Sequence, residues 1–142
     1  MTTLPIGQVS EQSGVKVPTI RYYEQIGLLP TPPRTEGNRR LYDGDDLKRL
    51  AFIRHARELG FDVGAIKALL SLQDHPEQSC SEADAIARSR LVEVRERISR
   101  LRALERELER MADHCEHTGT VAACHVIETL ADPTHRHGRL DD

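Results

Sequence analysis

Three cysteine residues give this 142-residue chain side chains that can hold a soft metal ion. Cys115 and Cys124 are separated by eight residues that include a glycine, so the chain between them can close around one ion. His117 lies within this segment, and His114 and His125 stand next to the two cysteines. Thiolates with imidazoles are the ligands of Zn²⁺ and of softer cations of similar charge. We predict a metal site from these five residues, with solvation as the alternative for His114 and His117, because loop histidines are usually solvated.

The third cysteine, Cys80, stands at the start of a dimerisation helix that we predict over residues 80–114, where no Pro or Gly occurs. Apolar residues recur along it at steps of three and four, as in an amphipathic coiled-coil helix. They are Leu91, Val94, Ile98, Leu101, Leu104, Leu108 and Met111. Because the chain offers no second long helix to cover this stripe, we expect a homodimer rather than an intramolecular pair. If the paired helices are antiparallel, Cys80 of one chain approaches Cys115 and Cys124 of the other.

An alternative role for the cysteines is that of small buried hydrophobic residues. That role leaves their convergence on one place unexplained, so we favour the metal site. Residues 115–131 are expected to form a metal-binding loop and a short helix, and residues 132–142 a flexible tail that frays. His135 and His137 in this tail could form a second metal site, since His tracts can bind metal.

Two short helices with a tight link are predicted near the N-terminus, an arrangement typical of a helix-turn-helix. The first spans residues 5–14, and the second starts near Pro18 and continues to about Ile26. Arg21 and Tyr22 fall in the N-terminal part of the second helix, which in a recognition helix points into the major groove. Arg suits phosphates and guanine edges, and a Tyr hydroxyl can bind phosphate. We predict that both residues contact DNA, with a solvated Arg and buried tyrosines as the alternative.

A small β-hairpin, or wing, is predicted next. Prolines keep residues 28–34 extended, a Glu-Gly-Asn turn follows, and residues 39–42 can return as a second strand. The basic residues of this wing are Arg34, Arg39 and Arg40. Asp43 is expected to cap a helix that ends at Gly60, and Asp62 is expected to cap another.

Residues 1–75 are therefore predicted to form a winged helix-turn-helix DNA-binding domain in a mainly α-helical chain. Residues 1–60 carry nine Lys or Arg against seven Asp or Glu, whereas residues 61–142 carry eleven against sixteen. An isoelectric point near 6.2 argues against a non-specific nucleic-acid coat but allows a local basic face. No apolar run approaches the roughly 20 residues that span a bilayer, and the N-terminus lacks a signal-peptide pattern. We expect a cytoplasmic protein without membrane contact, whose thiols stay reduced.

Several motifs, in this order and spacing, resemble the MerR family of winged-helix regulators. They are Ile6-Gly7-Gln8-Val9, Thr19-Ile20-Arg21-Tyr22-Tyr23-Glu24, Gly27-Leu28-Leu29, Gly37-Asn38-Arg39-Arg40-Leu41-Tyr42, Leu50-Ala51-Phe52-Ile53 and Leu59-Gly60-Phe61. Each motif is weak alone, but the combination is specific, and the similarity in architecture extends to about residue 130. The resemblance implies a homodimer with an antiparallel coiled coil and one DNA-binding head per protomer.

The resemblance also implies a target, a palindromic element between the −35 and −10 boxes of a promoter whose spacer is too long. Inducer binding would bend and untwist this double-stranded DNA so that bacterial RNA polymerase can use both boxes. The positions that match DNA-contacting residues of the family are Arg21 and Tyr22 in the recognition helix and Arg39 and Tyr42 around the wing. Further candidates are Thr19, Arg34 and Asn38.

The cysteine pattern resembles that of members that sense divalent ions, because copper and gold sensors carry serine at the position of Cys80. The spacing of Cys115 and Cys124 is similar to both zinc-type and mercury-type loops. Zinc-type members pair adjacent cysteines with a loop histidine and bind two ions, whereas here His114 precedes the first cysteine and His117 lies nearer the loop start. Ligation by histidine favours zinc or cadmium, while three thiolates suit mercury or lead. We expect zinc, cadmium or lead as the inducer, with mercury as the alternative.

Two other classes of function have less support. An enzyme such as a thiol or zinc hydrolase is not expected, because no general base is spaced recognisably from a nucleophile and no phosphate-binding glycine loop occurs. A cytoplasmic metal buffer or chaperone would explain the thiols, but it leaves the basic wing and the helix with Arg21 and Tyr22 without a purpose.

Overall fold

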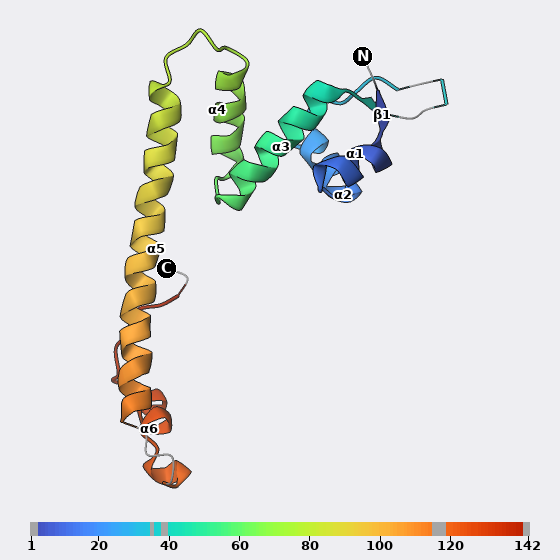
Figure 1. Cartoon of the computed structure of the whole chain (residues 1–142). Helices are drawn as coiled ribbons and strands as arrows, with labels where there is room; N and C mark the ends of the chain where they lie inside the picture. Colours follow the sequence, from blue (N-terminus) through green and yellow to red (C-terminus); the bar gives the residue numbers. More distant parts are fainter. Residues whose placement is uncertain (1–2, 35, 38–39, 115–118, 141–142) are drawn as a thin grey trace. The chain divides into compact units, whose positions relative to one another are not determined.

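The computed structural model of the chain describes residues 3–34, 36–37, 40–114 and 119–140. The chain forms two compact units, residues 1–87 and residues 88–142. The first contains β1 (Leu4–Pro5), α1 (Ile6–Ser13), α2 (Val17–Gln25), β2 (Leu41–Tyr42), α3 (Gly44–Glu58) and α4 (Val63–Gln73) (Figure 1). Helix α5 (Ser81–Asp113) begins in this unit and continues into the second, which also holds the 3₁₀ turn η1 (Val121–Ala123) and α6 (His125–Ala131). The prediction of a mainly helical fold is confirmed.

The helix-turn-helix consists of α1 and α2. Helix α1 ends because Gly14 adopts a left-handed conformation (φ 73°), and its N–H donates to the Ser10 carbonyl at 3.0 Å; a glycine does this without the steric cost of a side chain. Proline at the second position of α2 removes an N–H that the first turn would leave unpaired. Val9 of α1 and Ile20 of α2 are fully buried in the same apolar core.

The small antiparallel sheet differs in one respect from the predicted hairpin. Arg34 and Arg40 form an isolated antiparallel bridge, which is the predicted pairing across the wing. In addition, β2 pairs with β1, with Leu4 opposite Tyr42 and Pro5 opposite Leu41. The prediction of a helix from residue 5 was therefore wrong at its start, because this proline belongs to a strand. A two-residue strand is too short to show an alternating pattern.

Side-chain caps begin α3 and α4, as predicted. Asp43 accepts a hydrogen bond from the N–H of Asp46 at 3.0 Å, and Asp46 accepts one from the N–H of Asp43 at 2.9 Å, forming a capping box. Asp62 accepts from the N–H of Ala65 at 2.7 Å. Gly60, with φ 83°, separates the two helices. Such caps satisfy N–H groups that have no partner within the helix.

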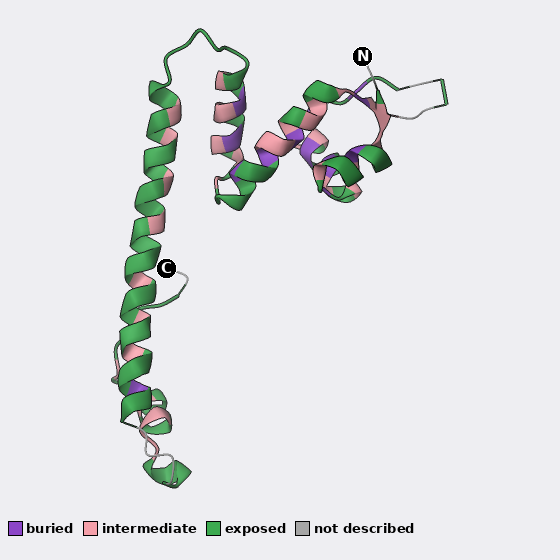
Figure 2. Cartoon of the chain, in the orientation of Figure 1, coloured by how far each residue is buried: buried purple, intermediate pink, exposed green. Residues whose placement is uncertain are grey.

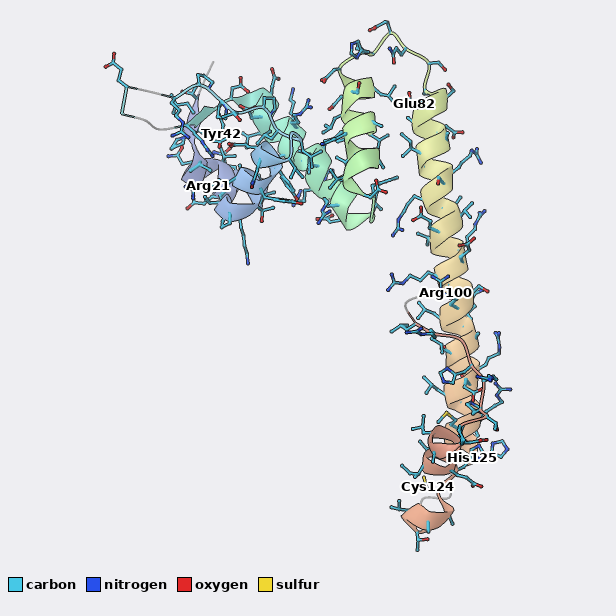
Figure 3. All side chains as sticks on the ribbon, turned by 180° about the vertical axis from the view of Figure 1, so that it is seen from behind. Arg21, Tyr42, Glu82, Arg100, Cys124 and His125 are labelled. Atoms are coloured by element: carbon cyan, nitrogen blue, oxygen red, sulfur yellow. The ribbon has the colours of Figure 1, made fainter. Side chains whose placement is uncertain are left out.

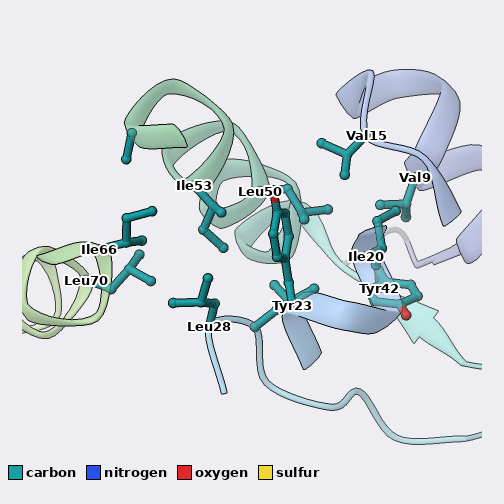
Figure 4. Packing of buried hydrophobic residues seen from close by; sticks show 12 residues of the cluster. Val9, Val15, Ile20, Tyr23, Leu28, Tyr42, Leu50, Ile53, Ile66 and Leu70 are labelled. Carbon is teal, nitrogen blue, oxygen red and sulfur yellow. The ribbon is translucent and has the colours of Figure 1, made fainter. Parts of the chain in front are cut away.

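One apolar core holds the elements of the first unit together (Figure 4). Helix α3 contributes Leu50 and Ile53, both fully buried, and packs against α1 and α4. The other buried apolar residues are Val9, Val15, Ile20, Tyr23, Leu28, Leu29, Tyr42, Ala56, Ile66 and Leu70. Burial of each large apolar side chain contributes about 1.5–3 kcal/mol, so the short helices are stable only as a packed unit.

Helix α5 is largely exposed along the second unit (Figure 2). Met111 is the one buried hydrophobic residue among the described residues of that unit. The large apolar side chains of α5 that remain exposed are Leu91, Val92, Ile98, Leu101 and Leu108. Apolar residues at helical spacing on a solvent-facing stripe are typical of a helix that packs against a partner. Nowhere in the described part of the chain does a helix combine the length and apolar character needed to cross a membrane.

Candidate nucleic-acid and metal-binding sites

Helix α2 presents an exposed face that suits DNA (Figure 3). Arg21 is exposed, and the neighbouring Tyr22 is 47% exposed. Tyr23 instead is buried in the core, with its ring centroid 6.2 Å from that of Tyr22. Successive side chains on a helix point about 100° apart, which explains why one tyrosine faces solvent and the next does not. A guanidinium beside a phenol can contact phosphates and base edges.

The strand that returns from the wing (residues 40–42) contacts α2 through the carboxylate of Glu24, which is buried. The side chain of Glu24 is only 4% exposed, and its Oε2 lies 2.8 Å from a guanidinium nitrogen of Arg40. Its Oε1 accepts a hydrogen bond from the hydroxyl of Tyr42, whose side chain is fully buried. Burial, together with the hydrogen bond to the Glu24 carboxylate and its negative charge, raises the pKa of Tyr42 to about 12. The phenol therefore stays protonated and donates throughout the neutral range.

The predicted DNA-contacting residues differ from one another in how far they are exposed to solvent. Arg21, Tyr22 and Arg34 are exposed, and Thr19 is half-buried near the start of α2. Tyr42 points into the core, so the structure gives its hydroxyl a partner within the protein. The last two candidates, Asn38 and Arg39, lie outside the described residues. Contact with DNA stays a prediction for all seven. Sequence reasoning gave Glu24 no role, because nothing local distinguishes it from an ordinary polar helix residue.

A histidine flanks each end of the segment from Cys115 to Cys124, and the rings of these two histidines lie close together. The rings of His114, just after α5, and His125, the first residue of α6, have centroids 5.1 Å apart. Nδ1 of His114 donates to the carbonyl of Arg110 at 2.7 Å, so in the neutral ring Nε2 carries the lone pair that can bind a metal ion. Cys124 is half-buried directly before α6 (Figure 3). Two imidazoles thus lie together at this end of α5, and Cys124 directly precedes one of them in the sequence; imidazole and thiolate are donors that suit a soft divalent ion.

The other predicted ligands are less fully placed. Cys80 is exposed and directly precedes α5; its carbonyl accepts from the N–H of Asp84 at 2.9 Å. Cys115 and His117 lie outside the described residues. Among the residues that the structure does describe, no three Cys, His, Asp or Glu side chains form a group that could hold an ion. The assignment of the ligands therefore stays a prediction.

A polar groove of about 650 Å³ adjoins the histidine pair. Its walls include His114, His125, Glu107 and His135. Nε2 of His135 lies 2.7 Å from Oε1 of Glu107, which also pairs with Arg110. Desolvation alone would raise the pKa of Glu107, but the charge of Arg110 and the hydrogen bond with His135 outweigh it and hold that pKa below its ordinary value. This contact between the C-terminal segment and α5 was not predicted, since it joins residues far apart in the sequence.

Comparison with known proteins gives a consistent result. Residues 4–73 match the family described as MerR HTH family regulatory protein, and residues 47–111 match the family described as MerR, DNA binding. The chain is 42% identical over 127 residues to the HTH-type transcriptional regulator ZntR of Escherichia coli K12, covering 88% of this chain and 90% of the relative. It is 35% identical over 125 residues to the mercuric resistance operon regulatory protein of Bacillus cereus, covering 88% and 95%. The crystal structure of the transcription regulator PbrR691 from Ralstonia metallidurans CH34 in complex with lead(II) superposes with a TM-score of 0.79 at 41% identity, covering 90% of this chain and 99% of that one.

Proposed function

Because this chain belongs to the MerR family of helix-turn-helix regulatory proteins, we propose that it is a metal-responsive transcriptional regulator. It binds a palindromic promoter element as a homodimer and activates transcription by distorting the DNA when a divalent soft metal ion binds. Zinc, cadmium or lead is the proposed inducer, and mercury is the alternative. The chain resembles relatives named for heavy-metal dependence and for mercuric resistance, and a transcription regulator whose crystal structure contains lead(II), so the metal class is better supported than any single ion.

The observation that carries this proposal is the contact between His114 and His125 beside Cys124. It brings two imidazole donors together at the end of α5, with Cys124 directly before His125 in the sequence, in a chain whose α2 presents Arg21 to solvent. A bound ion would be held by Cys124 and these histidines, together with Cys115 of the same chain and Cys80 of the second copy in the dimer as proposed ligands. The ion supplies a positive charge and a fixed set of bonds that join the loop to the helices beside it.

The homodimer is supported by the exposed apolar stripe of α5. Ile98 and Leu101 are each more than two-fifths exposed, one helical turn apart. Burial of such side chains against a second copy is favourable by about 25 cal/mol for each Å² removed from water. A dimer also provides two heads for the two halves of a palindromic site.

The energies required are compatible with this mechanism. Bending or untwisting a promoter site costs on the order of a few kcal/mol. An ion that binds one protein state more tightly than another shifts the equilibrium by its difference in binding free energy, and about 5.5 kcal/mol is enough to change a 1:99 ratio into 99:1. Several bonds from thiolates and imidazoles to one ion can supply a difference of this size.

The test is transcription in vitro from the promoter upstream of the protein's own gene, with bacterial RNA polymerase and purified protein. Zn²⁺, Cd²⁺, Pb²⁺, Hg²⁺ and Cu⁺ are titrated separately at buffered free concentrations. We expect one or more divalent ions to activate transcription, and Cu⁺ to have no effect. Silence with every ion, while the promoter DNA is still bound, would overturn the metal-sensing part of the proposal. Failure to bind any promoter fragment would favour a metal buffer.

A further inference from the structure

Glu24 occupies the place where the wing strand meets the recognition helix. It follows Arg21 by three residues in α2, and residues three apart lie on the same side of a helix. Yet Arg21 is exposed, whereas the Glu24 side chain is 4% exposed. The strand that returns from the wing covers the helix one turn beyond the exposed arginine, and Glu24 is the residue that receives it.

The carboxylate contacts this strand at two points. One oxygen accepts from the Tyr42 hydroxyl, and the other pairs with Arg40 at 2.8 Å. Residues 40 and 42 are two apart in an extended segment, so their side chains project from the same face. A hydrogen bond at one oxygen and an ion pair at the other, both to residues of one face, fix both the rotation of α2 and its position along the strand. A single contact would leave one of these free.

We propose that Glu24 is a positioning residue for promoter recognition, which sets α2 against the wing so that Arg21 and Arg34 engage one DNA site together. Arg40 and Tyr42 influence the position of α2 through their contacts with Glu24. Arg34 is tied to the same strand, because it bridges Arg40 across the wing. This inference rests on the proposed function, since it presupposes that α2 and the wing bind DNA.

Charge alone and positioning predict opposite effects of one substitution at Glu24 on the affinity for promoter DNA. DNA repels a carboxylate, so on charge alone the change Glu24→Gln should tighten binding to any duplex. If Glu24 positions the helix, the same change should weaken binding to the correct site, because the Arg40 charge loses its partner and the strand its fixed position. Affinity for a scrambled duplex depends mainly on phosphate contacts and should stay equal or increase slightly.

The experiment measures fluorescence anisotropy of the dimer on its own promoter fragment and on a scrambled fragment of equal length. We expect Glu24→Gln to weaken binding to the promoter at least tenfold without weakening binding to the scrambled DNA. Glu11→Gln, an exposed acid of α1, is the matched control with the same change in charge and should leave both affinities within about threefold. Unchanged or tighter promoter binding by Glu24→Gln would overturn the inference. A wild-type protein that does not distinguish the two fragments would overturn the proposed function as well.

A second variant separates positioning from direct contact and from loss of folding. Circular dichroism identifies a temperature at which every variant is folded, and the affinities are compared there. In the double variant Glu24→Gln with Arg40→Gln, neither charge is left without its partner, so promoter affinity should equal or exceed that of Glu24→Gln. If Arg40 instead contacted phosphate directly, its removal would weaken binding further and lower the salt dependence. That outcome, or an unfolded Glu24→Gln combined with normal promoter binding by Tyr42→Phe, would overturn the inference.

Discussion

The rings of His114 and His125 have centroids 5.1 Å apart, although ten residues lie between them in the sequence. One ring follows the end of α5 and the other begins α6, so their contact closes the loop that carries the cysteines. The groups that close it are themselves good ligands for soft divalent ions. An ion bound here would therefore strengthen a contact that the protein already makes.

The first prediction concerns His114. The change His114→Gln should lower the affinity for the inducing ion at least tenfold, because the ring has its Nδ1–H bonded to a carbonyl and can offer Nε2 to the metal. The chain offers a matched control in His75, which follows the C-cap of α4 and donates its Nδ1–H to the Ser71 carbonyl at 2.8 Å in the same way. Competition titration with a chromophoric chelator measures both variants. Equal losses for His75→Gln and His114→Gln would remove His114 from the ligand set.

The second prediction concerns Cys124. The change Cys124→Ser should leave affinity for promoter DNA within about threefold of the wild type but abolish transcription induced by metal. A serine hydroxyl stays protonated at neutral pH and is a poor ligand for soft ions, whereas a thiolate is a strong one. Transcription in vitro with the inducing ion provides the measurement, and Ala123→Ser in the adjacent turn is the control. An inducible Cys124→Ser protein would contradict the sensor role of this residue.

The elements of the first unit could be predicted because their signals act over a few residues. Asp43 and Asp62 cap helices through N–H groups three positions away, and Gly14 ends α1 through its own left-handed conformation. Helical geometry separates the directions of Tyr22 and Tyr23 by about 100°, but that Tyr22 faces solvent and Tyr23 the core is decided by the packing of α2 in the structure.

Contacts between distant segments were the part that the sequence did not predict. The burial of Glu24 depends on a strand that returns from the wing, and nothing local marks this glutamate for that role. The pairing of Leu4 with Tyr42 is likewise too short to leave a pattern. In the second unit, His135 belongs to a C-terminal segment that was expected to fray, yet its ring forms an ion pair with Glu107 of α5. Such contacts are decided by the packing of whole elements.

The third prediction concerns Arg21. The change Arg21→Ala should weaken promoter binding by about 1–3 kcal/mol, roughly five- to 150-fold, and should lower the slope of log affinity against log salt by about one if the contact is to phosphate. Metal affinity should not change. Arg97→Ala, an exposed arginine of α5, removes the same charge outside the proposed DNA-binding face. Unaltered promoter affinity of Arg21→Ala would show that α2 is not the recognition helix.

The fourth prediction concerns the dimer. The change Ile98→Glu should raise the dissociation constant of the homodimer at least tenfold, because pairing would bury a carboxylate without a partner. Ile98 is 41% exposed in the single chain, so the monomer should stay folded. Glu96 lies about 160° around the helix from it, and Glu96→Ala should leave the dimer intact. Sedimentation equilibrium measures both, and a monomeric wild-type protein would contradict the proposed dimer.

The fifth prediction follows from the raised pKa of Tyr42. An acid whose pKa is higher in the folded than in the unfolded chain contributes stability that is complete below the unfolded value, near 10, and is lost as pH rises towards the folded value, about 12. Between pH 9 and 11 the wild type should therefore lose about 1 kcal/mol more free energy of unfolding than Tyr42→Phe does. Urea denaturation at the two pH values measures this difference. Tyr22→Phe, which leaves Tyr42 and Glu24 unchanged, should retain the wild-type loss. An equal loss of unfolding free energy in Tyr42→Phe would mean that the hydrogen bond from the Tyr42 hydroxyl to Glu24 does not stabilise the fold. The contact between Glu24 and the returning strand would then depend on Arg40 alone.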